Sequence, residues 1–321
     1  MRPQPPTSGE LFVELLDFSR EGDQAPARRG SGPAPQPEAV RRPPSGGCHC
    51  PGPAEDGCCY LVLELATETL EQFLLGLQAP LCQSDVRRLF RQVCEVVAAL
   101  HSRGFVHLDI KPENLMWFPS GRFKLIDMDG MLRCGDRVPV SDVISTAKYC
   151  APEFAKASLD DDVADNVLLE VTAALDVFSL GLVGAELALR RHPLEEAWQQ
   201  FMGDSRDDEC GFYGFLTDPS RTVVEVPPEA RAFSPLFEDL LRCMLQTSPQ
   251  NRASMAEVLA HPFFHESPAQ VVAPAAPRAP HPLPLRRPSI RRWSVGGEFA
   301  PKQGAPAVHW APRLGCKFGG A

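Results

Sequence analysis

Proline is distributed very unevenly along this chain, and its distribution limits where a folded domain can lie. Of the 33 prolines, 11 fall within residues 1–53 and 10 fall within residues 266–321. Segments this rich in proline cannot bury enough apolar surface to offset the entropy lost on ordering, so we expect them to be disordered. The remainder, about 58–265, has the length and composition of one helical or mixed domain.

Charge is also divided unevenly between the tail and the rest of the chain. The formal net charge is −9, yet residues 266–321 contain eight basic and two acidic residues. The acidic remainder argues against nucleic acid as the main partner. The N-terminal residues lack the apolar core of a secretory signal, and the most apolar helical stretch, 167–190, is interrupted by acidic residues. We therefore expect no membrane partner and an intracellular protein, cytoplasmic or nuclear.

Two apolar runs of strand length, 11–18 and 58–66, lie on either side of a Pro/Gly/Arg-rich loop. They could pair as a hairpin despite this insert. Beyond Ala66 the apolar spacing becomes helical, and an N-cap at Ser84 with apolar residues every three or four positions predicts a helix of about 17 residues. The further predicted elements are short strands at 105–106 and 123–126, around a turn at 119–121, and helices near 176–190, 235–246 and 254–260.

Residues 106–115, VHLDIKPENL, form the segment that points to chemistry. Asp109, Lys111 and Asn114 lie in a predicted loop between a helix and a strand, and Asp127 follows the next strand. The turn at 119–121 folds this strand back, which can bring Asn114 and Asp127 together. Two oxygen ligands suit Mg²⁺, a hard cation that completes its shell with water and phosphate. A nearby carboxylate and ammonium group then suit phosphoryl transfer. The alternative is an ordinary polar loop without a chemical role.

Several motifs, in a fixed order over about 58–264, resemble those of the eukaryotic protein kinase family. A possible additional strand lies at 11–18. Their common order makes the resemblance specific, whereas a lone His-x-Asp would be weak evidence. The matching positions are His107, Asp109, Lys111 and Asn114 for the catalytic loop, Asp127-Met128-Asp129 for Asp-Phe-Gly, Ala151-Pro152-Glu153 for the end of the activation segment, Asp176 to Gly181 for the start of the central helix, and Arg252 for the partner of Glu153.

The resemblance implies a role for each residue of the catalytic loop. Asp109 would be the catalytic base and Lys111 would contact the phosphate. Asn114 and Asp127 would hold Mg²⁺ and, through it, the nucleotide. Thr146 would hydrogen-bond the catalytic loop. Lys111 together with Thr146 favours the serine/threonine branch of the family.

The same resemblance assigns 61–66 to the last small-lobe strand and the hinge. Leu63 would be the gatekeeper, and backbone groups of Glu64 and Ala66 would meet the adenine of ATP. The implied fold is α+β and protein-kinase-like, with a helical C-terminal lobe and a fragmentary N-terminal β lobe. The implied function is a transferase: transfer of the γ-phosphoryl group of ATP, with Mg²⁺, to Ser or Thr hydroxyls of a protein substrate.

Four departures from the family pattern qualify this reading. No lysine precedes Lys111, and Gly30-Ser-Gly32 is no convincing phosphate loop, so we expect the chain to begin inside the small lobe. It would be either an incomplete gene product or a variant that has lost ATP clamping. Leu108 replaces the Arg that reads an activation-loop phosphate, and Asp129 replaces a Gly. The alternative function is a catalytically weak or inactive pseudokinase that acts as a binding scaffold.

The predicted organisation has three parts. Residues 1–57 hold a partial small-lobe strand and a Pro/Gly-rich disordered insert, 58–265 form the kinase domain, and 266–321 form a basic disordered tail. In the tail, Ser289 and Ser294 each follow a pair of arginines, as in sites for an upstream basophilic kinase. The alternative is a basic tail without such a site.

Overall fold

The structure is a computed structural model that describes residues 11–13, 15–18, 61–160, 167–202, 208–224 and 226–265. The disorder predicted for the insert and the tail, and the sites at Ser289 and Ser294, lie outside the described residues. The division into segments at 57 and 265 stays a prediction. Within the described part, none of the helices combines the length and apolar character that crossing a bilayer requires.

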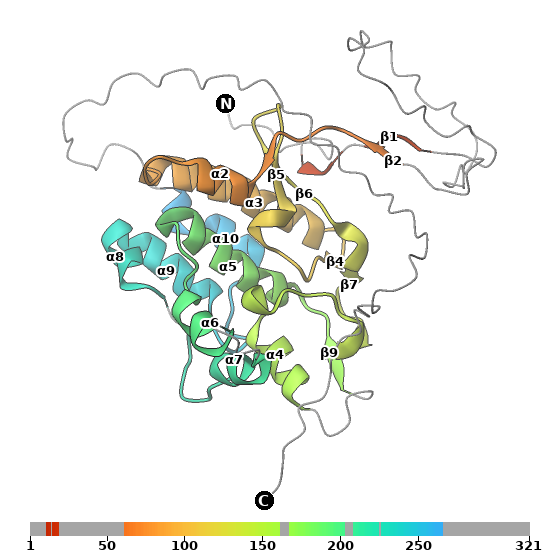
Figure 1. Cartoon of the computed structure of the whole chain (residues 1–321), viewed down its shortest axis with the longest axis vertical. Coiled ribbons are helices and arrows are strands. Elements are labelled where there is room, and N and C mark those ends of the chain that lie inside the picture. Colours follow the sequence, from red (N-terminus) through yellow and green to blue (C-terminus); the bar gives the residue numbers. More distant parts are fainter. Residues whose placement is uncertain are drawn as a thin grey trace, which may run out of the picture.

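Two short strands form the part of the molecule that precedes the hinge. β1 (Leu15–Phe18) pairs antiparallel with β2 (Leu61–Leu63), with Leu15 opposite Leu63. The two strands lie at one side of the molecule, away from most of the helices (Figure 1). The predicted pairing across the insert is therefore confirmed.

The N-terminal strand is shorter than predicted. Residues 11–18 were expected to form one strand, but Leu11 is buried in the core and Phe12 makes an isolated parallel bridge to Leu125. The guanidinium of Arg103 lies 5.0 Å from the centre of the Phe12 ring. Residues 11–12 therefore leave the ladder because they pack against the helical part of the chain.

The helical body is built around α5 (Ala173–Leu189), which is buried on nearly all sides. The helix predicted from Ser84 is α3 (Gln83–His101); its N-cap is Cys82, two residues earlier than predicted. α3 buries one stripe against α5, as expected for apolar residues at helical spacing. At their contact, a Cβ on Gly184 would lie 2.4 Å from the Phe90 ring, so this close approach requires glycine.

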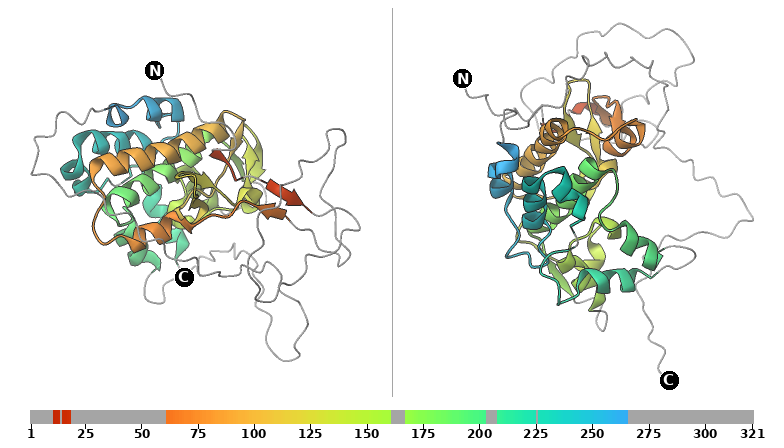
Figure 2. Two further views of the ribbon diagram at one scale, coloured as in Figure 1. Left: turned by 90° about the horizontal axis from the view of Figure 1, so that it is seen from above. Right: turned by 90° about the vertical axis from the view of Figure 1, so that its left-hand side faces the viewer.

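The remaining helices surround α5. Figure 2 shows α3 running along the body, and α10 packs beside it. The helices predicted near 176–190, 235–246 and 254–260 are confirmed as α5, α9 and α10, within a few residues. Of these, α9 spans Pro235–Met244 and α10 spans Met255–Ala260. The other described helices are α2 (Leu70–Gly76), α4 (Pro152–Leu159), α6 (Glu195–Met202), α7 (Glu209–Leu216) and α8 (Pro228–Phe233).

Three small sheets position the loops between α3 and α5. One has the order β3 (Glu68–Thr69), β5 (Leu115–Trp117), β6 (Phe123–Leu125), and its strands are antiparallel. The strands predicted around the turn at 119–121 were 105–106 and 123–126. In the structure β4 (Phe105–Val106) pairs instead with β7 (Leu132–Arg133), because β5 takes the place beside β6. The third sheet joins β8 (Arg137–Pro139) to β9 (Leu168–Glu170).

Candidate active site

The carboxylate of Asp176 holds the backbone of the loop between β4 and β5. This side chain on α5 is completely buried and accepts hydrogen bonds from the backbone N–H groups of His107 and Leu108, each at 2.8 Å. Leu108 has a φ of 72°, which non-glycine residues rarely adopt. The two hydrogen bonds compensate for this strain and fix the direction in which Asp109 leaves the loop.

His107 braces the loop from its other side. Its Nε2 lies 2.9 Å from the carbonyl oxygen of Ile126, so Nε2 carries the proton and donates it. Its Nδ1 can then accept from the backbone N–H of Asp109, at 3.3 Å. His107 therefore links the loop to the end of β6 and leaves the reacting groups to its neighbours.

The structure brings Asp109, Lys111, Asn114 and Thr146 into one hydrogen-bonded network. Oδ1 of Asp109 accepts from the backbone N–H of Thr146 at 3.1 Å and from its hydroxyl at 2.6 Å. Oδ2 of Asp109 lies 2.7 Å from the Lys111 ammonium and 3.1 Å from the Asn114 amide nitrogen. The Lys111 ammonium also donates to the Thr146 hydroxyl at 2.8 Å. The activation segment is thereby tied directly to the catalytic loop.

These contacts set the ionisation of Asp109. Partial burial alone would raise the pKa of its carboxyl. Hydrogen bonds from Lys111, Thr146 and Asn114, together with the Lys111 charge, outweigh burial and hold the pKa below its ordinary value. Asp109 is therefore ionised at neutral pH and can accept a hydrogen bond from a hydroxyl. A carboxylate of such low basicity is better suited to orienting a hydroxyl than to early proton removal.

Asp127 begins the short 3₁₀ turn at Met128–Gly130, directly after β6. Its φ is 61° and its side chain is exposed. The backbone N–H of the preceding residue, Ile126, donates to the carbonyl oxygen of Asn114 at 3.0 Å, so the ends of β5 and β6 lie side by side. The predicted approach of residues 114 and 127 is thus seen in the backbone.

The donor types at this end of the hairpin fit a hard cation. The amide nitrogen of Asn114 is used on Asp109, at 2.9 Å from its carbonyl oxygen, which leaves the Asn114 amide oxygen as a ligand. Asp127 supplies a carboxylate, and Asp129 in the same turn is also exposed. Among the described residues no group of three or more His, Cys, Asp or Glu could hold a metal. A cation here would therefore need further oxygens, such as those of a phosphate or water.

The predicted hinge residues follow β2. Leu63 is 49% exposed, and Ala66 leads into Thr67, whose backbone N–H donates to the carbonyl of Trp117 at 2.7 Å. The carboxylate of Glu64 forms an ion pair with the ammonium of Lys124 on β6. Sequence analysis missed Lys124; the available signal was a lysine inside the apolar strand FKLI. The nucleotide contacts of 63, 64 and 66 stay predictions, as do the roles of the catalytic-loop residues.

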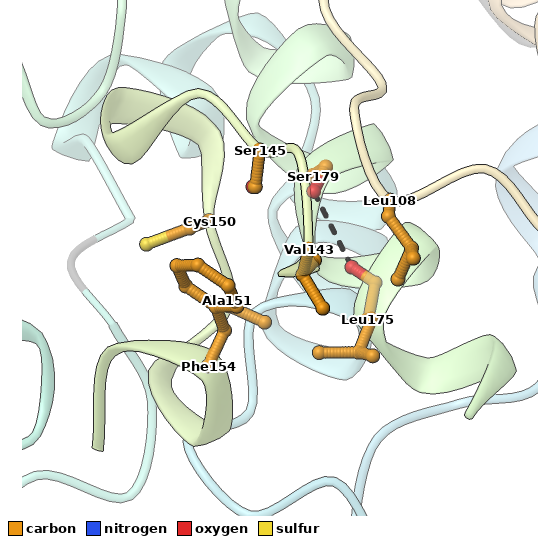
Figure 3. A pocket seen from close by; sticks show the side chains of 8 residues that line it. All are labelled: Leu108, Val143, Ser145, Cys150, Ala151, Phe154, Leu175 and Ser179. Atoms are coloured by element: carbon orange, nitrogen blue, oxygen red, sulfur yellow. Dashed lines mark hydrogen bonds between the residues drawn. The ribbon is translucent and has the colours of Figure 1, made fainter. Parts of the chain in front are cut away.

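Leu108 lines a small pocket between the catalytic loop, the activation segment and α5 (Figure 3). The cavity measures about 10 Å³, roughly the space of one water molecule. Its lining residues are Leu108, Val143, Ser145, Cys150, Ala151, Phe154, Leu175 and Ser179. None of them carries a positive charge, so this pocket offers no partner for an activation-loop phosphate.

Two anchors hold the activation segment at its ends. Glu153 receives two hydrogen bonds from the Arg252 guanidinium, at 2.7 and 2.9 Å, and the Arg252 side chain is fully buried. This confirms the pairing predicted from sequence. Near its start, the segment is anchored by the pairing of β7 with β4, which places Leu132 opposite Val106. No sequence signal indicated that second anchor.

Comparisons with known proteins agree with this geometry. The family model described as the protein kinase domain matches residues 54–264. Cyclin-dependent kinase 4 from Xenopus laevis is 32% identical over 230 residues, which cover 65% of this chain and 66% of that protein. Protein kinase gsk3 from Schizosaccharomyces pombe is 32% identical over 232 residues, which cover 64% of this chain and 55% of that protein. The chain thus spans about half to two thirds of the length of these relatives.

A solved structure, that of the CAK complex from Chaetomium thermophilum bound to ATP-gamma-S, shares the fold. The TM-score is 0.52 at 22% sequence identity, over 67% of this chain and 70% of that chain. The family model covers well over half of the chain, and the helical body with few strands agrees with the fold predicted from sequence. This chain therefore belongs to the protein kinase family and has its α+β fold, with a helical large lobe and a sparse small lobe.

Proposed function

We propose that this chain is a protein serine/threonine kinase that transfers the γ-phosphoryl group of ATP to hydroxyls of a protein substrate. The observation that supports this most strongly is the Asp109 network. An ionised carboxylate is held by an ammonium, an amide and the activation segment at distances of 2.6 to 3.1 Å. Such positioning is what phosphoryl transfer requires of a protein.

The proposed chemistry uses each member of the network. Asp109 accepts a hydrogen bond from the substrate hydroxyl and aligns its oxygen with the γ-phosphorus. As that oxygen bonds to phosphorus, the bond to the bridging oxygen breaks, ADP leaves with the electron pair, and Asp109 takes the proton. Lys111 neutralises charge on the transferred group while Thr146 holds Asp109 and Lys111 together. Asn114 and Asp127 would hold Mg²⁺, which supplies charge neutralisation at the phosphates.

The remaining site residues complete the proposal. Backbone groups of Glu64 and Ala66 would receive adenine, with Leu63 at the rear of that site. Since the pocket that Leu108 lines has no positively charged residue, activity would not depend on a phosphate in the activation segment. Ser289 and Ser294 would be targets of an upstream basophilic kinase, in the cytoplasm or nucleus.

The second candidate function is a scaffold with weak or no turnover. The observation that favours it is the absence from this sequence of any lysine before Lys111. Lys124, which lies behind the hinge, is engaged with Glu64, so it does not take over a phosphate-clamping role. In this case the same large lobe would bind nucleotide weakly and present its surface to a partner protein.

Substitution Asp109→Asn separates these possibilities. We expect phosphate transfer from labelled ATP to a generic basic protein to fall by about 10³-fold, because a positioned base contributes roughly 10²–10⁴-fold. Mg-ATP binding, followed by calorimetry, should persist in the variant. The exposed Asp85→Asn variant is the control. Equal transfer by Asp109→Asn would contradict the proposed kinase, and nucleotide binding without transfer by the unchanged chain would favour the scaffold.

A further inference from the structure

A buried ion pair lies directly behind the hinge. Lys124 is only 3% exposed, and its ammonium pairs with the Glu64 carboxylate and lies 5.0 Å from the centre of the Phe118 ring. The Glu64 side chain is 22% exposed. A lysine so deeply buried must be paired, because an isolated ammonium in such surroundings would be strongly unfavourable. Glu64 and Lys124 are 60 residues apart in the sequence, so the tertiary fold brings them together.

The same pair links two parts of the proposed nucleotide site. Lys124 lies on β6, opposite Met116 of β5, and this hairpin carries Asn114 just before β5 and Asp127 shortly after β6. The hinge is attached to the hairpin at both of its ends. Glu64 is held by Lys124, and the backbone N–H of Thr67 donates to β5. The backbone of residues 64–66 is therefore connected at both ends to the β5–β6 hairpin, which carries the proposed metal ligands.

We infer that Lys124 and Glu64 are positioning residues that set the hinge backbone for adenine relative to the phosphate end of the site. This inference rests on the proposed function, since it assumes that nucleotide binds along the hinge. Neither side chain needs to touch the nucleotide. Their attraction holds the 64–66 peptide groups at a fixed distance from the hairpin, so the hydrogen bonds to the base are pre-organised.

Because both members of the pair are charged, substitutions can separate its effect on nucleotide affinity from its effect on folding stability. Removing the carboxylate alone takes the Glu64 charge away from a buried ammonium, which costs stability as well as position. Removing both charges relieves that cost but does not restore the attachment. A purely structural pair would therefore show parallel changes in stability and nucleotide affinity. A positioning pair would show loss of affinity in the double variant even where stability recovers.

The test uses the full chain with variants Glu64→Gln and Lys124→Met, alone and together. Calorimetry in Mg²⁺ measures the dissociation constants of ADP and GDP, and a thermal melt measures stability. We expect Glu64→Gln to weaken ADP binding about tenfold and to lower the ADP-to-GDP preference by a similar factor. The double variant should melt higher than Glu64→Gln yet keep the weakened, less selective binding. Lys124→Arg, which keeps a positive charge opposite Glu64, should retain the selectivity of the unchanged chain.

A matched control lies at the other end of the same hairpin. Arg122 pairs with Glu95 at 2.8 Å, and both side chains are 24% exposed. Arg122→Met should lower the melting temperature without changing base preference. If Glu64→Gln keeps the affinity and preference of the unchanged chain, the inference is overturned while the proposed function stands. If the unchanged chain binds no Mg-ADP, both are overturned. Should Lys124→Met fail to fold, Glu64→Gln and Lys124→Arg decide the matter.

Discussion

The large lobe and the hinge region hold their polar groups in contrasting ways. In the large lobe, Asp176 and Arg252 are buried, and each makes several hydrogen bonds to backbone and side chains at once. At the hinge, Leu63 and Leu65 are 49% and 83% exposed, and Glu64 pairs with Lys124 behind them. Several buried contacts therefore fix the catalytic loop, whereas the segment proposed to read the base lies near the surface, with Glu64 paired to Lys124.

From this difference we expect the large lobe to govern folding stability and the hinge to govern selectivity for the base. A polar group with several buried partners cannot move without losing all of them, so loss of one residue should affect the whole lobe. A segment held at two points can shift locally while the rest of the molecule stays folded. We therefore expect large-lobe substitutions to act on global unfolding and hinge-side substitutions to act locally.

The largest effect is expected at Arg252 in the large lobe. Arg252→Met removes the partner of Glu153 and leaves that partly buried carboxylate uncompensated, which costs about 3–5 kcal/mol of the free energy of unfolding. Urea denaturation measures this loss. The control is Arg242→Met, which breaks an exposed pair with Glu238 at 2.9 Å and should cost no more than about 1 kcal/mol. Similar losses of unfolding free energy in the two variants would contradict the expectation that buried, multiply bonded groups contribute more to stability than exposed pairs.

The second prediction concerns how the stability of the large lobe depends on pH. Burial, with the Lys148 charge adding to it, lowers the pKa of His192 from its ordinary value near 6.5 to about 3. The unfolded chain takes up a proton below pH 6.5 and the folded chain does not, so stability is lost as pH falls from 6.5 towards 3. Between pH 6.5 and 5 the loss should be about 2 kcal/mol.

The variant His192→Asn tests this dependence. An Asn oxygen can keep the acceptor that His192 Nδ1 offers to the backbone N–H of Leu194, at 3.1 Å, but it does not titrate. Urea denaturation at several pH values should therefore give a flatter profile for this variant between pH 6.5 and 5. The unchanged chain, measured at the same pH values, is the reference for the slope. An unaltered slope in His192→Asn would show that other groups cause the acid sensitivity.

The smallest effect is expected where the N-terminal segment meets the helical body. Phe12→Leu keeps apolar volume against the core and removes the contact of the ring with the Arg103 guanidinium, which is worth about 0.5–1 kcal/mol at an incompletely buried site. Global unfolding should change by no more than about 1 kcal/mol. Hydrogen exchange at the backbone around Leu125, to which Phe12 is bridged, should become faster. A global loss as large as that of Arg252→Met would show that the two regions form one cooperative unit.

Much of the catalytic site could be predicted because its residues lie close together in the sequence. Asp109, Lys111 and Asn114 fall within one short loop, and that loop can reach few arrangements once Asp176 holds its backbone. The helices were predicted for a similar reason, since apolar spacing reports directly which face is buried. The partner of β6, which is β5, was not predicted, because strand pairing depends on which segment lies beside it in the folded chain.

The order of chemical groups along the chain by itself pointed to the family, which the comparisons confirm, and to candidate site residues, whose roles stay predictions. Only the tertiary structure decided that Lys124 reaches Glu64, that β8 pairs with β9 and that Leu108 lines a pocket without a positive charge. Each of these contacts joins segments far apart in the sequence. Their formation depends on how α3, α5 and the β5–β6 hairpin pack, and local composition carries no record of that packing.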